Sequence, residues 1–275
     1  MAPPPRGVSP TRERLDVLLV ERGLLPSREQ ARAAVMAGEV RVDGRAVDTP
    51  GARISSAATL TLERRRPLYV SRGGIKLSHA LATFRISSEG LIALDVGSST
   101  GGFTDALLQA GAARVYAVDI GTGQLHWRLR RDPRVMVRER THAARLTDAE
   151  VPELIDLATV DVSFISLTRV LPAVAARLRS DGTILALVKP QFEAGRARVR
   201  GGVVRSAEVH RDVLRRLAAW VGDHGWRVAG LTASPLAGPK GNREFFLWIR
   251  LTPPAPGRSG EIEAMIEAAL AEAHG

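Results

Sequence analysis

The chain has 275 residues, of which 45% are hydrophobic, and it contains no cysteine and only six scattered histidines. This length is enough for one large domain and one small domain, each with a core. The composition excludes disulfides, thiolate metal sites and a cysteine nucleophile, and we expect no metal site. No apolar run approaches the length of a membrane span, and residues 1–10 lack the apolar core of a secretory signal, so we expect a cytoplasmic protein without a membrane partner.

The charge balance is strongly basic, with 39 Lys and Arg against 29 Asp and Glu and a net charge of +10. Such a chain suits a polyanionic partner, because arginines that face phosphates release bound counterions. A solvated, arginine-rich surface is the equal alternative. Only three of the cations are lysines, at positions 76, 189 and 240. A partly desolvated amine can give up its proton and act as a base, whereas a guanidinium cannot, so these lysines are candidate functional groups.

Residues 1–66 are predicted to form a flexible, proline-rich tail over 1–11 and a small α+β domain over 12–66. Leucines at helical spacing predict a helix over 12–23, and a second helix over 27–38 begins with the capping pattern of Ser27 and Gln30. The stretch "EVRVDGRAV" alternates valines before Asp43-Gly44, which is typical of a tight hairpin, and "ATLTLE" predicts another strand. We therefore expect two short helices packed on a small sheet.

The order of "RLDVLL", "SREQAR" and "EVRVDG" resembles that of the S-four-type RNA-binding module. The resemblance implies that the small domain binds RNA. Arginines on its helices, in the linker and just after it are the candidate phosphate contacts: Arg14, Arg28, Arg32, Arg65, Arg66 and Arg72. The alternative is a small helix and hairpin domain with ordinary surface arginines.

Residues 67–275 are predicted to form a larger α/β domain after the arginine-rich linker. Apolar runs such as "LIALDVG", "RVYAVDIG", "LATVDVSFI" and "TILALVKP" alternate with helical stretches. Continuous apolar strands separated by helices imply a parallel sheet that is covered on both faces. The last two strands, over 226–235 and 243–251, are joined by a short loop, so we expect them to be antiparallel at one edge of the sheet.

The first strand of this domain runs into the glycine-rich turn "DVGSSTGGFTD" at 95–105. Its glycines allow a ligand to approach the backbone, and the helix that follows offers free N–H groups. The second strand ends at Asp119, where such folds place a carboxylate that accepts hydrogen bonds from a ribose diol. The turn is not G-x-G-x-x-G and lacks the Lys-Ser/Thr pair of a phosphate-binding loop, which disfavours dinucleotides and ATP.

A D-x-G-x-x-x-G-G turn paired with that acid resembles the S-adenosylmethionine site of Rossmann-like methyltransferases. The resemblance implies S-adenosylmethionine as the cofactor. The candidate contacts follow the first four strands: Asp95, Gly97, Ser98, Ser99, Thr100, Gly101, Gly102, Phe103, Asp119, Ile120, His142 and Asp161. Taken singly, Asp95 is equally well explained as a capping residue, and Asp119 as a strand-end carboxylate that faces water.

Four polar residues at predicted element ends are expected to meet beside this turn. Lys76 lies just ahead of the first strand, Asp161 and Lys189 close two later strands, and Glu244 opens the last one. The carboxyl ends of parallel strands border the ligand crevice, and the start of an antiparallel strand points to the same edge. Such a set suits methyl transfer to a ribose 2′-hydroxyl: Lys189 takes the proton, Lys76 positions the hydroxyl, and the carboxylates orient the amines.

This tetrad resembles that of the FtsJ-like ribose 2′-O-methyltransferases. With "YVSRGGIKL", "DVGSSTGGFTD", "DVSFISL", "VKPQFE" and "GNREFFLW" in order, the chain is similar over 12–251 to the TlyA, or haemolysin-like, family of rRNA methyltransferases. The resemblance implies a Rossmann-like fold with a mostly parallel seven-stranded sheet, and 2′-O-methylation of cytidine in ribosomal RNA or ribosomal subunits. No obligate protein partner is evident from the sequence. His142 stands where the family is expected to have Asn.

Two other functions remain open at this point. One is a non-catalytic RNA-binding protein that keeps a methyltransferase scaffold, which the intact tetrad opposes. The other is a membrane-active haemolysin, which would need a spanning segment or a strongly amphipathic basic helix, and the sequence shows neither. The arginine-rich loop over 195–205 is expected to be a lid or an exposed linker, and Lys240 a surface or RNA-facing cation.

Overall fold

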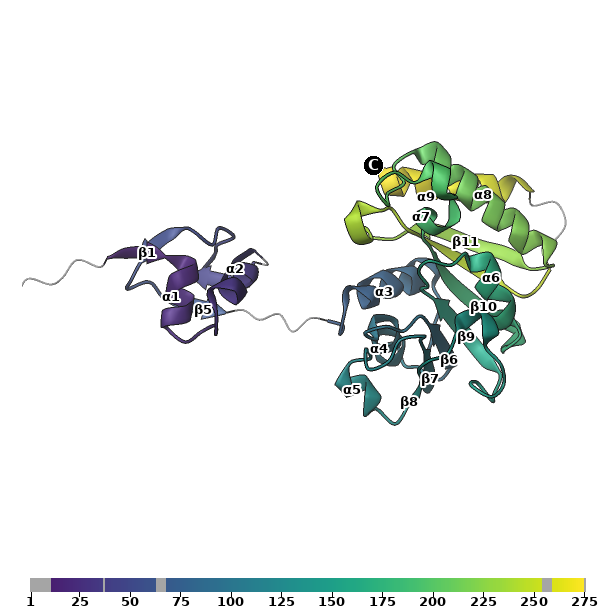
Figure 1. Cartoon of the computed structure of the whole chain (residues 1–275), viewed down its shortest axis with the longest axis horizontal. Helices are drawn as coiled ribbons and strands as arrows, with labels where there is room; N and C mark the ends of the chain where they lie inside the picture. Colours follow the sequence, from purple (N-terminus) through teal and green to yellow (C-terminus); the bar gives the residue numbers. More distant parts are fainter. Residues whose placement is uncertain (1–10, 37, 63–67, 254–258, 275) are drawn as a thin grey trace, which may run out of the picture. The chain divides into compact units, whose positions relative to one another are not determined.

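The computed structural model describes residues 11–36, 38–62, 68–253 and 259–274, which fall into two compact units divided after residue 67 (Figure 1). Most of the expected tail, and the linker residues Arg65 and Arg66, lie outside the described residues. Each unit has its own hydrophobic core, so each is described by itself.

The N-terminal unit packs two helices against short strands around buried leucines, including Leu15, Leu18 and Leu19. β1 pairs antiparallel with β4, and β3, β2 and β5 form a second small sheet. The elements are β1 (Arg12–Arg14), α1 (Leu15–Glu21), α2 (Arg28–Met36), β2 (Val40–Val42), β3 (Arg45–Ala46), β4 (Arg53–Ser55) and β5 (Leu60–Leu62).

Local signals in this unit behave as the sequence predicts, with one exception. The Ser27 hydroxyl accepts the Gln30 N–H at 3.2 Å, and Asp43 and Gly44 both have positive φ, as a tight two-residue hairpin turn requires. The predicted start of the first helix is wrong. Arg12–Arg14 are extended because they pair with Arg53–Ser55, a partner distant in the chain.

The C-terminal unit contains a seven-stranded sheet in the order β11-β12-β10-β9-β6-β7-β8. Its strands are β6 (Ile92–Val96), β7 (Arg114–Val118), β8 (Val135–Arg138), β9 (Ile155–Val160), β10 (Leu178–Val188), β11 (Arg227–Ala233) and β12 (Phe245–Arg250). Only β12 runs against its neighbours. The expected mostly parallel sheet is confirmed, and its antiparallel strand lies one place in from the edge.

Helices cover both faces of this sheet, because neighbouring strand residues point to opposite sides. Ala93 and Leu185 pack with α3 and α4, whereas Leu94 and Ile184 pack with α6, α8 and α9 (Figure 1). The helices are α3 (Arg72–Phe84), α4 (Gly102–Gln109), α5 (Trp127–Arg130), α6 (Leu167–Ala175), α7 (Pro190–Glu193), α8 (Ala207–Asp223) and α9 (Ser259–His274), with 3₁₀ turns η1 (Ala143–Arg145), η2 (Arg196–Arg198) and η3 (Pro239–Gly241).

The chain order reverses between the adjacent strands β6 and β9, and this switch point positions the site. Val96 pairs with Val160, so the residues that follow them, Gly97 and Asp161, leave the sheet side by side. Gly97 has φ +85°, and a Cβ there would lie 2.3 Å from the Asp161 carbonyl oxygen. Glycine is required at this position, because any side chain would push the two strand ends apart.

Candidate active site

Two lysines and two carboxylates that are distant in the chain form two ion pairs. Lys76 Nζ lies 2.6 Å from Glu244 Oε2, and Lys189 Nζ lies 2.6 Å from Asp161 Oδ1. The two lysine side chains are 11% and 12% exposed, so both amines are largely removed from water. Lys189 also donates to Ser163 Oγ at 3.0 Å. The structure therefore brings the four predicted residues together as pairs, each with one amine and one carboxylate.

Asp161, Lys189 and Glu244 stand at strand ends, but the placement predicted for Lys76 needs correction. Lys76 lies in the second turn of α3, a helix that the sequence analysis did not anticipate. The Gly73-Gly74 pair in this helix is a local pattern that is typical of a turn rather than of a helix. In the structure a Cβ at Gly74 would lie 2.2 Å from the Tyr69 ring, so the glycine lets the helix pass close to that ring.

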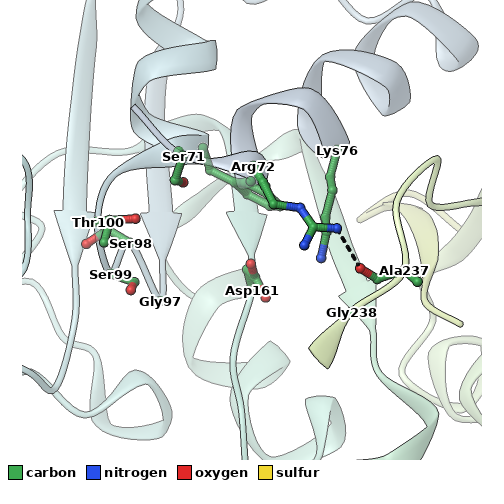
Figure 2. Close-up of a pocket in the computed structure, with 13 residues that line it drawn as sticks. Ser71, Arg72, Lys76, Gly97, Ser98, Ser99, Thr100, Asp161, Ala237 and Gly238 are labelled. Atoms are coloured by element: carbon green, nitrogen blue, oxygen red, sulfur yellow. Dashed lines mark hydrogen bonds between the residues drawn. The ribbon is translucent and has the colours of Figure 1, made fainter. Parts of the chain in front are cut away.

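A pocket of about 240 Å³ opens beside Lys76. Figure 2 shows Gly97 to Thr100 on one side, Ala237 and Gly238 on the other, and Asp161 between them. The guanidinium of Arg72 donates to the Ala237 carbonyl at 3.2 Å and closes part of the rim. The lining residues are Ser71, Arg72, Gly73, Lys76, Gly97, Ser98, Ser99, Thr100, Gly102, Phe103, Asp161, Ala237 and Gly238.

A second pocket, of about 620 Å³, adjoins the first and shares Gly97, Ser99 and Asp161 with it. Asp119 lies on its wall, where one carboxylate oxygen accepts the Ser99 N–H at 2.8 Å and the other accepts the Gly121 N–H at 2.7 Å. The remaining lining residues are Val118, Ile120, Gln124, Thr141, His142, Ala143, Val162, Ser163, Phe164, Ile165 and Arg169. Lys76 and Asp161 thus face a two-part cavity at the switch point of the sheet, and each of them is paired with one of the other two tetrad residues, Glu244 and Lys189.

Comparison with known proteins identifies the family. The family model described as FtsJ-like methyltransferase matches residues 69–251, and that of the S4 domain matches residues 13–59. The chain is 46% identical over 267 residues to the putative rRNA methyltransferase YqxC of Bacillus subtilis, covering 96% of this chain and 94% of that protein. It is 47% identical over 244 residues to the 16S/23S rRNA (cytidine-2'-O)-methyltransferase TlyA of Mycobacterium tuberculosis, covering 87% and 90%.

The chain belongs to the TlyA family of FtsJ-like methyltransferases. Solved structures agree with this assignment. A putative hemolysin from Streptococcus thermophilus is 44% identical, with a TM-score of 0.72 over 95% of this chain and 97% of that chain. A second, from Lactococcus lactis, is 40% identical, with a TM-score of 0.68 over 74% and 98%.

The methyl donor of this family is S-adenosylmethionine, as the sequence predicts. The residues of the two pockets fit it. The Asp119 carboxylate keeps lone pairs toward the larger pocket, which suits a ribose diol, and the backbone of the 97–102 turn approaches the cavity without side chains at Gly97 and Gly102. His142 lies on the same wall and accepts the Ala144 N–H through Nδ1 at 3.2 Å.

Two of the predicted cofactor residues of this TlyA-family site, Asp95 and Gly101, line neither of the two pockets. They support the site from outside the cavity. Asp95 is fully buried, and it accepts the hydroxyls of Thr104 at 2.6 Å and Thr159 at 3.2 Å. Burial, and to a smaller extent the charge of Asp161, raise the pKa of Asp95 to about 7 against the opposing threonine hydrogen bonds. Asp95 therefore bridges β6, β9 and α4, and its predicted role in cofactor binding stays a prediction.

Gly101 lets the glycine-rich turn over 97–102 pack tightly against α5 and the residues just before it. Its φ is +97°, and a Cβ there would lie 2.2 Å from a Leu129 methyl carbon and 2.8 Å from one of Leu125. The glycine therefore sets the position of the turn without bordering the cavity. The remaining predicted cofactor residues all line one or both pockets.

Sequence reasoning missed Phe164, Ser163 and Gly238. Phe164 is 91% exposed, has φ +64° and lies with its ring 4.9 Å from that of Phe192, on the wall of the larger pocket. Its position three residues after the strand-end carboxylate Asp161 was the available signal. Gly238 packs against Glu244, since a Cβ there would lie 2.0 Å from Glu244 Oε1.

The described arginines that are candidates for RNA binding differ in their surroundings. Arg14 pairs with Asp16 at 2.9 Å, and Arg28 approaches the same buried carboxylate at 3.4 Å. The hydrogen bond from Arg14 holds the pKa of Asp16 below its ordinary value. Arg32 is exposed on α2, whereas Arg72 lies in the other unit, at the rim of the smaller pocket. Arg14 and Arg28 therefore stabilise the fold as well as carrying charge.

Two features are absent from the described part of the chain. No group of three His, Asp or Glu side chains there is arranged to hold a metal ion. No described helix combines the length and the apolar character that crossing a membrane demands.

Proposed function

We propose that this protein transfers the methyl group of S-adenosylmethionine to the 2′-hydroxyl of a cytidine in ribosomal RNA. The observation that carries the proposal is that Lys76 and Asp161 line one cavity that fits the cofactor, each in an ion pair, with Glu244 and Lys189 respectively. The M. tuberculosis relative, which is 47% identical, is named for this reaction on cytidine in ribosomal RNA, and this supports the same reaction and substrate here.

When bound, S-adenosylmethionine supplies an electrophilic methyl group on a positive sulfur. Lys189, in its neutral form, accepts the proton of the ribose hydroxyl as that oxygen attacks the methyl carbon. Asp161 and Ser163 both bind the Lys189 amine, at 2.6 and 3.0 Å, and together they fix its position. Lys76, held by Glu244, positions the hydroxyl and stabilises the negative charge that develops on its oxygen.

The cofactor residues have distinct roles in this proposal. Asp119 would accept hydrogen bonds from the ribose diol of the cofactor, and the turn over 97–102 would help to hold it. Ile120 and His142, which line the larger pocket, would contribute contacts to the base. The exposed ring of Phe164 suits the stacking of an unpaired base, the form in which most sequence-specific RNA recognition occurs.

The N-terminal unit provides the second part of the proposal. Residues 12–66 act as the RNA-binding domain and residues 67–275 as the methyltransferase domain. Arg28 and Arg32 contact backbone phosphates from α2, and Arg72 does so at the rim of the catalytic pocket. The partner is a ribosomal subunit or its RNA, and the protein works in the cytoplasm, where ribosomes are found.

Mapping of 2′-O-methylation tests the function. Ribosomal subunits are incubated with S-adenosylmethionine and either the wild-type protein or Lys189→Ala, and the methylated nucleotide is located in the RNA. We expect one or a few new 2′-O-methylcytidines with the wild type and none with the variant. If both proteins bind RNA and neither methylates it, the chain is an RNA-binding protein on a methyltransferase scaffold.

A further inference from the structure

Asn242 is the only asparagine in the 275 residues, whereas glutamine occurs four times. It lies in the loop between β11 and β12, two residues before Glu244, and is only 2% exposed. A buried side-chain amide needs hydrogen-bond partners at both of its ends. The question is therefore what this amide holds.

Both ends of the amide bind the backbone of a segment that is distant in the chain. Asn242 Nδ2 donates to the Gly202 carbonyl at 2.9 Å, and Asn242 Oδ1 accepts the Val204 N–H at 3.1 Å. The Val204 carbonyl in turn accepts a hydrogen bond from His210 Nε2 on α8 at 3.2 Å. The partner segment is thus anchored to a long helix of the methyltransferase unit.

The backbone of Asn242 belongs to the loop that holds Glu244. Its carbonyl accepts the Gly238 N–H at 2.8 Å, and the Glu244 carbonyl accepts the Ser234 N–H at 2.8 Å. Gly238 lies against the Glu244 carboxylate, so the hydrogen bond to Asn242 fixes the wall behind that carboxylate. The Glu244 carboxylate is the 2.6 Å partner of Lys76.

The chemistry explains why this residue is asparagine. Aspartate can accept the Val204 N–H but has no donor for the Gly202 carbonyl, and it would bury a second negative charge close to Glu244. Glutamine is one carbon longer, and alanine would remove the partner of the Gly202 carbonyl and leave the N–H of the buried Val204 unpaired. A neutral amide of this length satisfies both groups and leaves the charge balance of the Lys76–Glu244 pair unchanged.

We infer that Asn242 is a positioning residue for the Lys76–Glu244 pair, acting by clamping the Glu244 loop to residues 202–204. The inference rests on the proposed methyl transfer, because it assigns a role within that site. A clamp of this kind acts on the rate of transfer rather than on cofactor affinity, since Asn242 lines neither pocket.

Kinetics of Asn242→Ala, Glu244→Gln and the double variant test the inference. We expect Asn242→Ala to lower kcat for methylation of ribosomal RNA at least tenfold, while the Kd for S-adenosylmethionine by calorimetry stays within twofold. In the Glu244→Gln background the same change should have little further effect, because both variants disturb one unit. Effects that multiply, or a kcat for Asn242→Ala within twofold of the wild type, would overturn the inference.

A matched control separates positioning from general stability. Thr232→Ala removes a hydrogen bond of similar burial, to Glu272 on α9 at 2.8 Å, on the neighbouring strand β11. We expect it to lower Tm and leave kcat at 25 °C unchanged. If Asn242→Ala behaves in the same way, Asn242 is only a structural residue. If Asn242→Ala does not fold, Asn242→Asp replaces it, with the same expected loss of kcat.

A crystal structure of the folded Asn242→Ala variant tests the clamp independently of activity. The Lys76 Nζ to Glu244 Oε2 distance, 2.6 Å in the wild-type protein, should exceed 4 Å in Asn242→Ala, the limit for an ion pair. An unchanged pair overturns the inference. A wild-type protein that methylates no RNA would instead defeat the proposed function, and the two failures are therefore distinguishable.

Discussion

At the scale of single residues, the choice between lysine and arginine carries chemical information in this chain. Only three of 39 Lys and Arg residues are lysines, and two of them, Lys76 and Lys189, are largely buried and paired with carboxylates. Lys240 is exposed and donates a hydrogen bond to the Gly201 carbonyl at 3.4 Å. A buried amine that can release its proton is what the proposed transfer requires, and arginine would not serve.

Lys189→Arg is the corresponding prediction. A guanidinium keeps the positive charge beside Asp161 but cannot take a proton from the ribose hydroxyl, so we expect methyl transfer to fall by at least about 10²-fold. RNA affinity and Tm should remain near the wild-type values. Single-turnover methylation of ribosomal RNA measures the effect, and Lys240→Arg is the control. Retained turnover in Lys189→Arg would count heavily against its role as the base.

Gly97→Ala tests the close approach of the two strand ends. The new Cβ would lie 2.3 Å from the Asp161 carbonyl oxygen at φ +85°, so β6 and β9 must separate at the cofactor turn. We expect the Kd for S-adenosylmethionine to rise at least tenfold, together with a loss of stability of about 1–3 kcal/mol from backbone strain. Gly123→Ala is the control, because Gly123 has φ +71° but nothing within 4 Å of its Cβ position. Equal cofactor affinity in the two variants would show that backbone strain, and not the close contact with the Asp161 carbonyl oxygen, causes the change in affinity.

At the scale of the elements, the site is assembled by the ends of strands and by one helix start. β6 and β9 bring Gly97 and Asp161 together, β10 presents Lys189, and β12 presents Glu244 from the opposite direction. Asp95 ties this arrangement together, since its carboxylate joins β6 to Thr159 on β9 and to Thr104 on α4. A buried acid in that place makes the stability of the unit depend on pH.

The Asp95→Asn variant isolates this dependence. Burial raises the pKa of Asp95 from about 3.8 to about 7, so between these values the folded state binds more protons than the unfolded state. Its stabilising contribution is therefore complete below about pH 4 and is lost as the pH rises through 7. We expect the wild-type free energy of unfolding, relative to Asp95→Asn, to fall by up to about 1.4 kcal/mol per pH unit over that window. Urea unfolding at several pH values measures it, and parallel curves for the two proteins would contradict it.

At the scale of the whole molecule, two units with separate cores share one chain. The S4 unit carries exposed arginines on α2, and the methyltransferase unit carries the buried tetrad. Under the proposed function, one unit contributes affinity for RNA and the other contributes chemistry. Substitutions in the two units should therefore change different kinetic constants.

Arg32→Glu tests this division. Loss of a phosphate contact weakens binding and reduces its dependence on salt, so we expect a several-fold higher KM for ribosomal RNA and a shallower salt slope. The kcat and the Kd for S-adenosylmethionine should not change. Arg177→Glu is a matched control, because Arg177 lies just before β10, at the opposite end of that strand from Lys189. Equal effects of the two variants would indicate a general charge effect.

The sequence by itself determined the features that depend on local pattern. The apolar runs predicted the strands, the turn over 95–105 indicated the cofactor side, and the rarity of lysine pointed to Lys76 and Lys189. These signals are readable because each is contained in a short stretch of chain. The hairpin turn at Asp43-Gly44 belongs to the same class, since its positive φ values follow from those residue types.

Only the tertiary structure decided which amine meets which carboxylate. The pairing of Lys76 with Glu244 spans 168 positions in the chain, and no local pattern encodes such a distance. The same holds for the position of Asp95 outside the cavity, for the strand over Arg12–Arg14 and for the clamp made by the Asn242 side chain. In each case the partner comes from a remote segment, and burial and hydrogen bonding set the role only when the sheet has brought both together.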